Sequence, residues 1–299
     1  MEQPVSGDAV HRRTLRIEIG PVRGEQRAVD AHLLDWRYRG VSRVGIHVKR
    51  PGPIHDMSAQ FAVDAEGLAI ESARGAMALA AFDGTPDTGF QSCRDILPNV
   101  AGLAGIPVDP DLVAAMRRTV GRERGCYHLG TLILATAPVL QRIAAEKPRP
   151  EQGLGRELVL DAVNIGGGRT RFDGALRDWH DGMAERRARL AFSVSYAEPR
   201  AVDVLAPGAP AVAARLEGTP LEAGFAREAL ARLADLPDCD ALRDLALGLS
   251  AIFTQGMVQS RPVDSPPVPP GRAHRAHNTC WMWRAGGPLQ GMSSGLGED

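Results

Sequence analysis

The stretch VDAHLLDW (Val29–Trp36) returns in altered form as FDGALRDW (Phe172–Trp179), with Asp, Leu, Asp and Trp at matching positions. Each copy is followed by strand-like sequence and then by a long apolar helix that ends in glutamine, Gln141 in the first copy and Gln255 in the second. A shared order of elements is what an internal duplication leaves in a sequence. We therefore expect the chain to contain two copies of one structural plan.

The first copy is expected to begin with strands and end with helices. Partial alternation of apolar and polar residues predicts strands, and the sequence AEG (65–67) predicts the turn of a hairpin. The expected strands are 13–19, 27–38, 42–49, 56–64 and 68–80. From Cys93 a helical period predicts helices over 93–104, 109–120 and about 126–146, with Pro138 as a kink or as a break into two pieces.

The second copy repeats this order after a polar linker at 146–155. Strands are expected near 159–164, 169–179, 186–197 and 200–205, and helices near 221–235 and 239–258. The predicted fold class is α+β, with two tandem, pseudo-repeated domains that each form an antiparallel sheet covered by C-terminal helices. These domains are residues 10–148, which carry the candidate site, and residues 156–260, a degenerate copy. Residues 261–299 form a Pro-rich extended tail with an aromatic segment.

The composition of the 299 residues is that of a soluble globular protein, with 44% hydrophobic residues, 24% charged residues and a net charge of −1. This balance lacks the basic excess of a nucleic-acid-binding protein. No apolar run is long enough to cross a membrane and the N-terminus lacks a signal-peptide core, so we expect a cytoplasmic protein. Gly166–Gly168 predicts a hairpin turn, because no phosphate-binding motif follows it, and no nucleotide cofactor is expected. The oligomeric state stays open, with a homodimer as one possibility.

Four short polar islands interrupt apolar sequence in the first copy: His55-Asp56 in IHDM, Cys93 in FQSC, and Cys126 and His128 in GCYHL. Thiol, imidazole and carboxylate groups are the side chains that bind zinc or iron. Each island also has an ordinary explanation, since Asp56 could cap a turn and free cysteines are among the most buried residues. The sequence therefore predicts a site more clearly than it predicts a reaction.

The local structure expected around these islands favours some of them as site residues. Adjacent strand residues face opposite sides of a sheet, so only one of His55 and Asp56 can point into a cleft, and we favour His55. Cys93 and Cys126 stand at the expected N-termini of helices, where the helix dipole lowers the pKa of a thiol. Cys126 and His128 diverge on a regular helix but could converge in a non-helical first turn.

The second copy has lost most of these polar groups. Aligning Phe61 with Phe192 puts Arg186 and Arg187 at the places of His55 and Asp56, and aligning the last helices puts Cys239 and Ala241 opposite Cys126 and His128. The polar groups are therefore not needed to build the fold, which favours a functional role for the first set.

The tail segment AHNTCWMWRAGGPL holds a second cluster of reactive and aromatic residues: His277, Asn278, Cys280, Trp281 and Trp283. The tryptophans could simply attach the tail to the body of the protein. Alternatively, the tail closes a pocket for an apolar or aromatic ligand, with His277 or Cys280 reaching the site. Under that interpretation Tyr127, His277, Trp281 and Trp283 contact the substrate.

Residues 10–145 resemble a bacterial domain family of unknown function, number 2889. The matching residues are His55, Asp56, Met57, Cys93, Gly125, Cys126, His128 and Leu129. The chain departs from that family's pattern at Tyr127, where Thr is usual, and at Thr131, where Glu is usual. If that Glu serves chemistry in the family, this chain does something different.

The order of a hairpin, a Cys-led helix and a Cys/His-led last helix is also similar to the NifU/SufE type of iron–sulfur scaffold. That resemblance implies that His55 or Asp56, Cys93, and Cys126 with His128 converge on one metal or cluster. The gap from Asp56 to Cys93 is longer than the resemblance leads us to expect.

These observations together predict a small-molecule enzyme with a single site in the first copy. We expect a Zn or Fe ion held by His55, Cys93 or Cys126, and His128, with Asp56 as an orienting group or general base. The expected reaction class is hydrolysis or lyase chemistry on carbonyl-bearing substrates, aromatic ones included. A metal-free enzyme with Cys126 or Cys93 as nucleophile and His128 as base is one alternative. A non-catalytic carrier of sulfur or of an iron–sulfur cluster, or a ligand-binding protein, is another.

Overall fold

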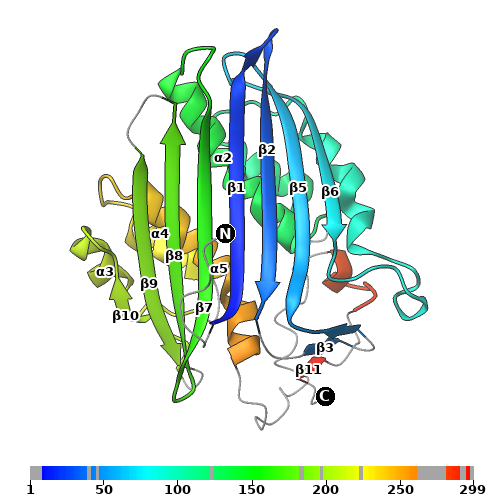
Figure 1. The fold of residues 1–299 in the computed structure, drawn as a ribbon, viewed down its shortest axis with the longest axis vertical. Coiled ribbons are helices and arrows are strands. Elements are labelled where there is room, and N and C mark those ends of the chain that lie inside the picture. The colour runs from blue at the N-terminus through cyan, green and yellow to red at the C-terminus, as the bar shows by residue number, and fades with distance from the viewer. Residues whose placement is uncertain are drawn as a thin grey trace.

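An eight-stranded antiparallel sheet organises the chain, in the strand order β10-β9-β8-β7-β1-β2-β5-β6 (Figure 1). The computed structural model describes residues 9–38, 42–44, 47–121, 124–181, 185–195, 198–221, 225–260, 281–289 and 294–296. The strands of the large sheet are β1 (Ala9–Arg23), β2 (Gln26–Arg37), β5 (Gly52–Asp64), β6 (Ile70–Leu79), β7 (Leu154–Gly166), β8 (Arg169–His180), β9 (Arg186–Ser195) and β10 (Val202–Leu205). A small sheet joins β3 (Ser42–Val44), β4 (His47–Lys49) and β11 (Ser294–Leu296).

Two long helices, α2 (Tyr127–Glu146) and α5 (Asp240–Ser260), pack on one face of the large sheet (Figure 1). The alternation of buried and exposed residues along β2 is what a strand covered on one face produces. The other helical elements are η1 (Pro86–Thr88), η2 (Cys93–Leu103), α1 (Leu112–Val120), α3 (Pro210–Leu216), α4 (Phe225–Arg232) and η5 (Trp281–Trp283). The core lies between the sheet and these helices and includes Leu33, Leu132 and Leu249.

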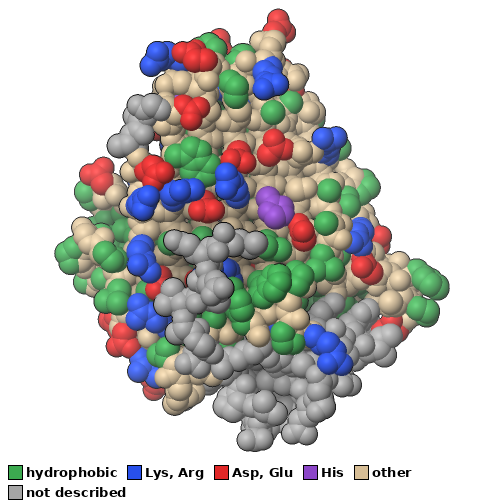
Figure 2. Space-filling view, viewed as in Figure 1, with side chains coloured by type: hydrophobic (Ala, Val, Ile, Leu, Met, Phe, Trp, Pro, Cys, Tyr) green, Lys and Arg blue, Asp and Glu red, His purple; other side chains and the backbone are tan. Residues whose placement is uncertain are grey.

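The other face of the sheet carries charged side chains of both signs (Figure 2). Pairs such as Arg12 with Asp161 and His32 with Asp56 link neighbouring strands across this face. Such partly exposed pairs contribute little to stability, so this face resembles an ordinary solvated surface.

The sheet joins the two halves of the chain, whereas the sequence led us to expect a separate sheet in each. β1 pairs with β7 from Ala9–Val163 to Ile19–Leu154, so the strands of both halves form one continuous layer. Each half nevertheless keeps its predicted order, with four large-sheet strands followed by helices. The mixed α and β character is as predicted.

Several local expectations differ from the structure. Residues 93–103 form a 3₁₀ helix with Pro98 inside it, and α2 is continuous through Pro138. The short helix α3 was not expected.

Gly166, Gly167 and Gly168 form the turn between β7 and β8 with positive φ angles, as the hairpin prediction requires. Among the described helices, none has the length and apolarity needed to cross a membrane.

Candidate functional site

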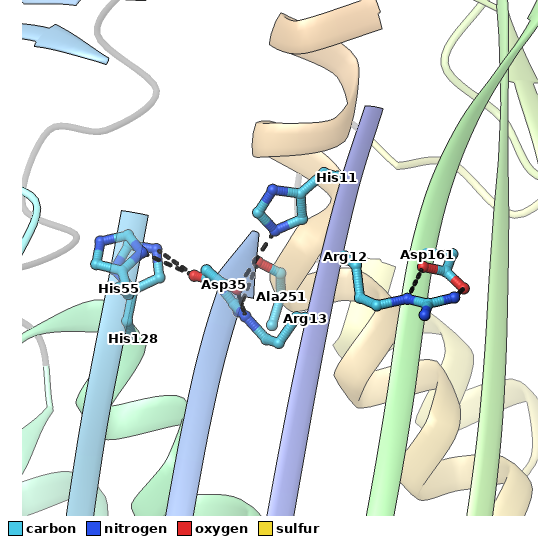
Figure 3. Close-up of polar contacts among 8 residues, drawn as sticks. All are labelled: His11, Arg12, Arg13, Asp35, His55, His128, Asp161 and Ala251. Carbon is cyan, nitrogen blue, oxygen red and sulfur yellow. Dashed lines mark hydrogen bonds and ion pairs between the residues drawn. The ribbon is translucent and has the colours of Figure 1, made fainter. Parts of the chain in front are cut away.

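A buried carboxylate lies at the centre of a polar cluster where β1 and β2 meet beneath the helices (Figure 3). Arg13 donates to both oxygens of Asp35, from Nε to Oδ1 at 2.7 Å and from Nη2 to Oδ2 at 2.8 Å. The two residues are direct cross-strand partners, and both side chains are fully buried. Nη1 of Arg13 lies 3.3 Å from the carbonyl oxygen of Ala251 on α5, so the helix of the second half closes this cluster.

Two further histidines complete the shell of Asp35. His55, at the start of β5, lies opposite Asp35 in the strand register, and its Nδ1 is 2.8 Å from Oδ2. His11, on β1, has its Nε2 3.3 Å from Oδ1. The carboxylate of Asp35 on β2 is therefore surrounded by nitrogen atoms of three side chains from the two flanking strands, β1 and β5.

His128, in the first turn of α2, lies on top of His55. The two rings stack with centroids 3.7 Å apart and an interplanar angle of 27°, and Nε2 of His128 is 3.9 Å from Oδ2 of Asp35. Potential ligand atoms of Asp35, His55 and His128 all lie within 4.8 Å of one another, a spacing suited to a metal ion. Nε2 of His55 is buried and has no hydrogen-bond partner among the described residues.

The thiol of Cys126 adjoins the imidazole of His128. Sγ of Cys126 lies 3.9 Å from Nδ1 of His128, because Cys126 is the N-cap of α2 with extended backbone angles rather than helical ones. This non-helical position is how two residues only two apart in sequence converge. Cys93, the first residue of η2, is hydrogen-bonded to Cys126. Cys126, His128, His55 and Asp35 thus form a continuous run of contacts.

The charges of this cluster follow from burial and from its hydrogen bonds. Burial alone would raise the pKa of Asp35, but the charge of Arg13 and the hydrogen bonds of His11, His55 and Arg13 hold this pKa well below its usual range. Burial lowers the pKa of His55 in spite of its bond to Asp35. Burial, followed by the proximity of His55 and Arg13, lowers the pKa of His128 strongly. Both imidazoles are therefore neutral at pH 7, the form that binds metals or accepts protons.

The pKa of the Cys126 thiol is lowered from its usual value. The hydrogen bond with Cys93 lowers its pKa most, burial opposes this, and the backbone N–H groups of Leu129 and His128 lower the pKa further. A helix N-terminus favours a thiolate for the same reason.

The cluster reaches solvent on the side of His128. The side chain of His128 is 17% exposed, whereas His55 and Asp35 are buried. Tyr127 is 40% exposed and its ring meets the edge of His128. A small molecule could therefore approach His128 and Tyr127, while the buried ion pair of Arg13 and Asp35 stays shielded from solvent.

The structure corrects our placement of Asp56. Its Oδ1 lies 2.7 Å from Nε2 of His32 on the open face of the sheet, where its side chain is 41% exposed. His55 and Asp56 are adjacent strand residues and therefore face opposite sides of the sheet. Asp56 consequently neither orients a ligand nor acts as a base in this cluster, whereas His55 faces inward.

Part of the tail lies beside the site. The backbone N–H of Trp281 donates to the carbonyl oxygen of Gly125 at 2.8 Å, and Met282 is buried against the core. The guanidinium of Arg284 lies 3.4 Å from the centroid of the Trp281 ring, so one face of that ring is already covered. The predicted substrate contacts of Trp281 and Trp283 stay predictions, and His277 and Cys280 lie outside the described residues. Cys239 is remote from this cluster in its contacts, since its thiol donates to backbone oxygens of Leu233 and Leu236.

Our sequence interpretation missed Asp35, Arg13 and His11. Asp35 continues the inward series Val29, Ala31 and Leu33, and a carboxylate at an apolar-phase position of a strand is a detectable signal. In the sequence alone, Asp35 stands out only as one of the residues shared by VDAHLLDW and FDGALRDW.

A second buried ion pair lies between β7 and β8 in the other half of the chain. Arg156 on β7 and Asp178 on β8 are direct cross-strand partners joined by two bonds of 2.7 and 2.8 Å. Here the neighbours are Asp244, 2.5 Å from Arg156, and Arg142, 2.9 Å from Asp178. The Arg156–Asp178 pair is thus surrounded by charged side chains, whereas the Arg13–Asp35 pair is surrounded by imidazoles.

Residues 11–142 match the model of a family described as protein of unknown function, DUF2889. The matched segment holds every residue of the cluster from His11 to His128. No curated protein and no solved structure matches the chain.

Proposed function

We propose that the cluster is the metal centre of a small-molecule enzyme, with a Zn²⁺ or Fe²⁺ ion bound by His55, His128 and one thiol, that of Cys126 or Cys93, and with one position left open for water or substrate. The observation that carries this proposal is the buried Nε2 of His55, which has no partner among the described residues and adjoins the stacked ring of His128. A buried polar atom without a hydrogen bond is costly, and a metal ion would satisfy it. Neutral imidazoles and thiolates are donors that zinc and ferrous iron bind well.

Catalysis is favoured over a purely structural ion by the unequal burial of the cluster. Structural zinc sites are closed by four protein ligands, whereas catalytic sites leave one position open. Here the inner side of the cluster is closed by the buried side chains of Arg13 and Asp35, while His128 and Tyr127 are partly exposed to solvent. A bound ion would supply Lewis-acid chemistry by polarising a carbonyl group or activating water. The proposed reaction class is therefore hydrolysis or lyase chemistry on a carbonyl-bearing small molecule.

We further propose that the two halves arose by duplication and that only the first kept the site. The Arg–Asp pairs support this, since Arg13–Asp35 and Arg156–Asp178 share the same cross-strand pairing and bond lengths. Asp178 lies opposite Arg186 in the strand register, where Asp35 lies opposite His55. The carrier alternative gains less support, because two cysteines rather than three adjoin the histidines among the described residues.

Cobalt substitution tests the proposed ligand set. Co²⁺ added to metal-free protein should give visible bands of low-symmetry coordination and a thiolate-to-cobalt charge-transfer band. Cys126→Ser should abolish or weaken the charge-transfer band, and His55→Gln should lower the affinity for Co²⁺ strongly. Cys239→Ser is the matched control, because Cys239 is equally buried but bonded to backbone oxygens in the second half. Absence of saturable Co²⁺ binding in the wild type would exclude the metal centre.

A metal-free Cys126–His128 enzyme is the second candidate. The 3.9 Å contact between Sγ of Cys126 and Nδ1 of His128, together with the lowered pKa of that thiol, supports it. Iodoacetamide kinetics separate the two candidates. A free nucleophile should react at Cys126 at the same rate with and without a chelator, whereas a metal ligand should react only after the chelator removes the ion.

A further inference from the structure

The carboxylate of Asp35 has little capacity left for a metal ion. An ionised carboxylate offers about four acceptor positions. Arg13 occupies one on each oxygen, His55 takes a second on Oδ2, and His11 lies 3.3 Å from Oδ1. Direct binding of an ion by Asp35 would have to displace at least one of these contacts within a fully buried cluster.

The hydrogen bond between Asp35 and His55 has a direct chemical consequence. Because an ionised carboxylate only accepts hydrogen bonds, Nδ1 of His55 must carry the proton in their 2.8 Å contact. A neutral imidazole has one N–H, so Nε2 then has its lone pair available. This is the same Nε2 that is buried without a partner among the described residues.

We propose that Asp35 is a positioning residue that fixes the Nδ1–H tautomer of His55, so that Nε2 is the metal-binding atom, and that Arg13 holds Asp35 in this role. This inference rests on the proposed function, because it assigns the ligand atom of the same site. It places Asp35 behind the ligands, although its oxygens lie close enough to His55 and His128 to suggest a three-ligand site. Carboxylates that orient metal-binding histidines in this way strengthen the ligand without touching the ion.

The second half of the chain supplies the comparison that isolates this role. Asp178 forms the same two bonds with Arg156, but its other partner is the guanidinium of Arg142 instead of an imidazole. A variant at Asp178 therefore disturbs an equally buried ion pair without changing any histidine tautomer at the site. Asp178→Asn is the matched control for Asp35→Asn.

The first experiment needs no metal. Histidine labelled with ¹⁵N in the apo protein distinguishes ring nitrogens that carry a proton from those that do not, and His55→Gln identifies the signals of His55. We expect His55 to show a protonated Nδ1 and an unprotonated Nε2 in the wild type and in Asp178→Asn. In Asp35→Asn the Nε2–H tautomer should gain population. A protonated Nε2 in the wild type would overturn the inference even if Asp35→Asn failed to fold.

The second experiment measures Co²⁺ affinity and the cobalt spectrum in the same variants. A positioning role predicts that Asp35→Asn weakens Co²⁺ binding by about 10- to 100-fold while the spectrum at saturation keeps its shape. A changed spectrum at saturation would show that Asp35 is a ligand, and equal affinities in Asp35→Asn and Asp178→Asn would show a merely structural role. If the wild type bound no Co²⁺, the proposed function would fail while the tautomer result would still stand or fall on its own.

Discussion

Arg12 and Arg13 are neighbours with nearly identical ion pairs in opposite surroundings (Figure 3). Arg12 bonds both oxygens of Asp161 at 2.7 and 2.8 Å on the open face, and Arg13 bonds both oxygens of Asp35 at the same distances inside. The outer pair is partly exposed, at 17% and 19%, and the inner pair is fully buried. Burying two charges costs desolvation that their attraction only partly repays, so the inner pair is better explained by function than by stability.

This difference predicts unequal costs for removing each arginine. Arg13→Met should lower the free energy of unfolding by about 3–5 kcal/mol, because it leaves Asp35 buried without its main countercharge. Arg12→Met should cost about 1 kcal/mol or less. The double variant Arg13→Met/Asp35→Leu should recover much of the loss in urea unfolding. A double variant no more stable than Arg13→Met would contradict the explanation that the loss comes from the unpaired charge of Asp35.

The neutral histidines predict a dependence of stability on pH in the apo protein. Burial lowers the pKa of His55 and His128 below the value of about 6.5 expected in the unfolded chain. The unfolded state therefore takes up protons first as the pH falls. Stability should be complete above about pH 6.5 and decrease as the pH falls below it, by up to about 1.4 kcal/mol per pH unit for each group.

Urea unfolding of metal-free protein between about pH 7 and 5 measures this slope. His128→Gln should flatten it. Equal slopes in the wild type and His128→Gln would refute the assignment of this pH dependence to the cluster.

At the scale of elements, the start of α2 determines whether the site assembles. A Cβ atom on Gly125 would lie 1.7 Å from the carbonyl oxygen of Val120, so only glycine allows the chain to enter α2 at this angle. The direction in which the chain enters α2 sets the extended backbone of Cys126. Gly125 also provides the carbonyl oxygen that accepts a hydrogen bond from the backbone N–H of Trp281.

Gly125→Ala should therefore weaken Co²⁺ binding as well as stability, because it displaces Cys126 and His128. Gly130→Ala is the matched control on the same helix, since its Cβ would meet the same oxygen at an ordinary 3.6 Å. A helix interior gains about 1 kcal/mol when Ala replaces Gly, so this control should be neutral or stabilising. Normal cobalt binding in Gly125→Ala would contradict the role of this turn.

The sequence could predict those parts of the site that depend on local pattern. The inward direction of His55 follows from strand alternation, and the position of Cys126 before α2 follows from the helical period. The contact of Cys126 with His128 depends on backbone angles at one residue, which periodicity does not specify. Asp35 escaped notice because a single carboxylate in a strand is visible as a site residue only once its partners on β1 and β5 are known.

At the scale of the whole molecule, the junction between β1 and β7 could not be predicted from the sequence. Both strands have the same alternating pattern, and such a pattern does not identify the neighbour across the sheet. The junction brings α5 over the cluster, where the carbonyl oxygen of Ala251 meets Arg13. The second half therefore supports the site without supplying the proposed ligands.

This arrangement predicts the behaviour of the first half alone. A fragment of residues 9–150 would expose the edge of β1 from Ala9 to Ile19, and an unpaired central edge tends to pair with another chain. We expect the fragment to form a two-fold dimer in which β1 pairs with its own copy, as it pairs with β7 here. Size-exclusion chromatography with light scattering measures this, with the full chain as reference. A folded monomeric fragment would contradict the prediction.

The most direct test of the metal centre is elemental analysis of the full chain purified without added metal. We predict about one zinc or iron ion per chain in the wild type and in His32→Gln, and almost none in folded His55→Gln. A wild-type protein that carries no zinc or iron and takes up none on addition would contradict the central claim.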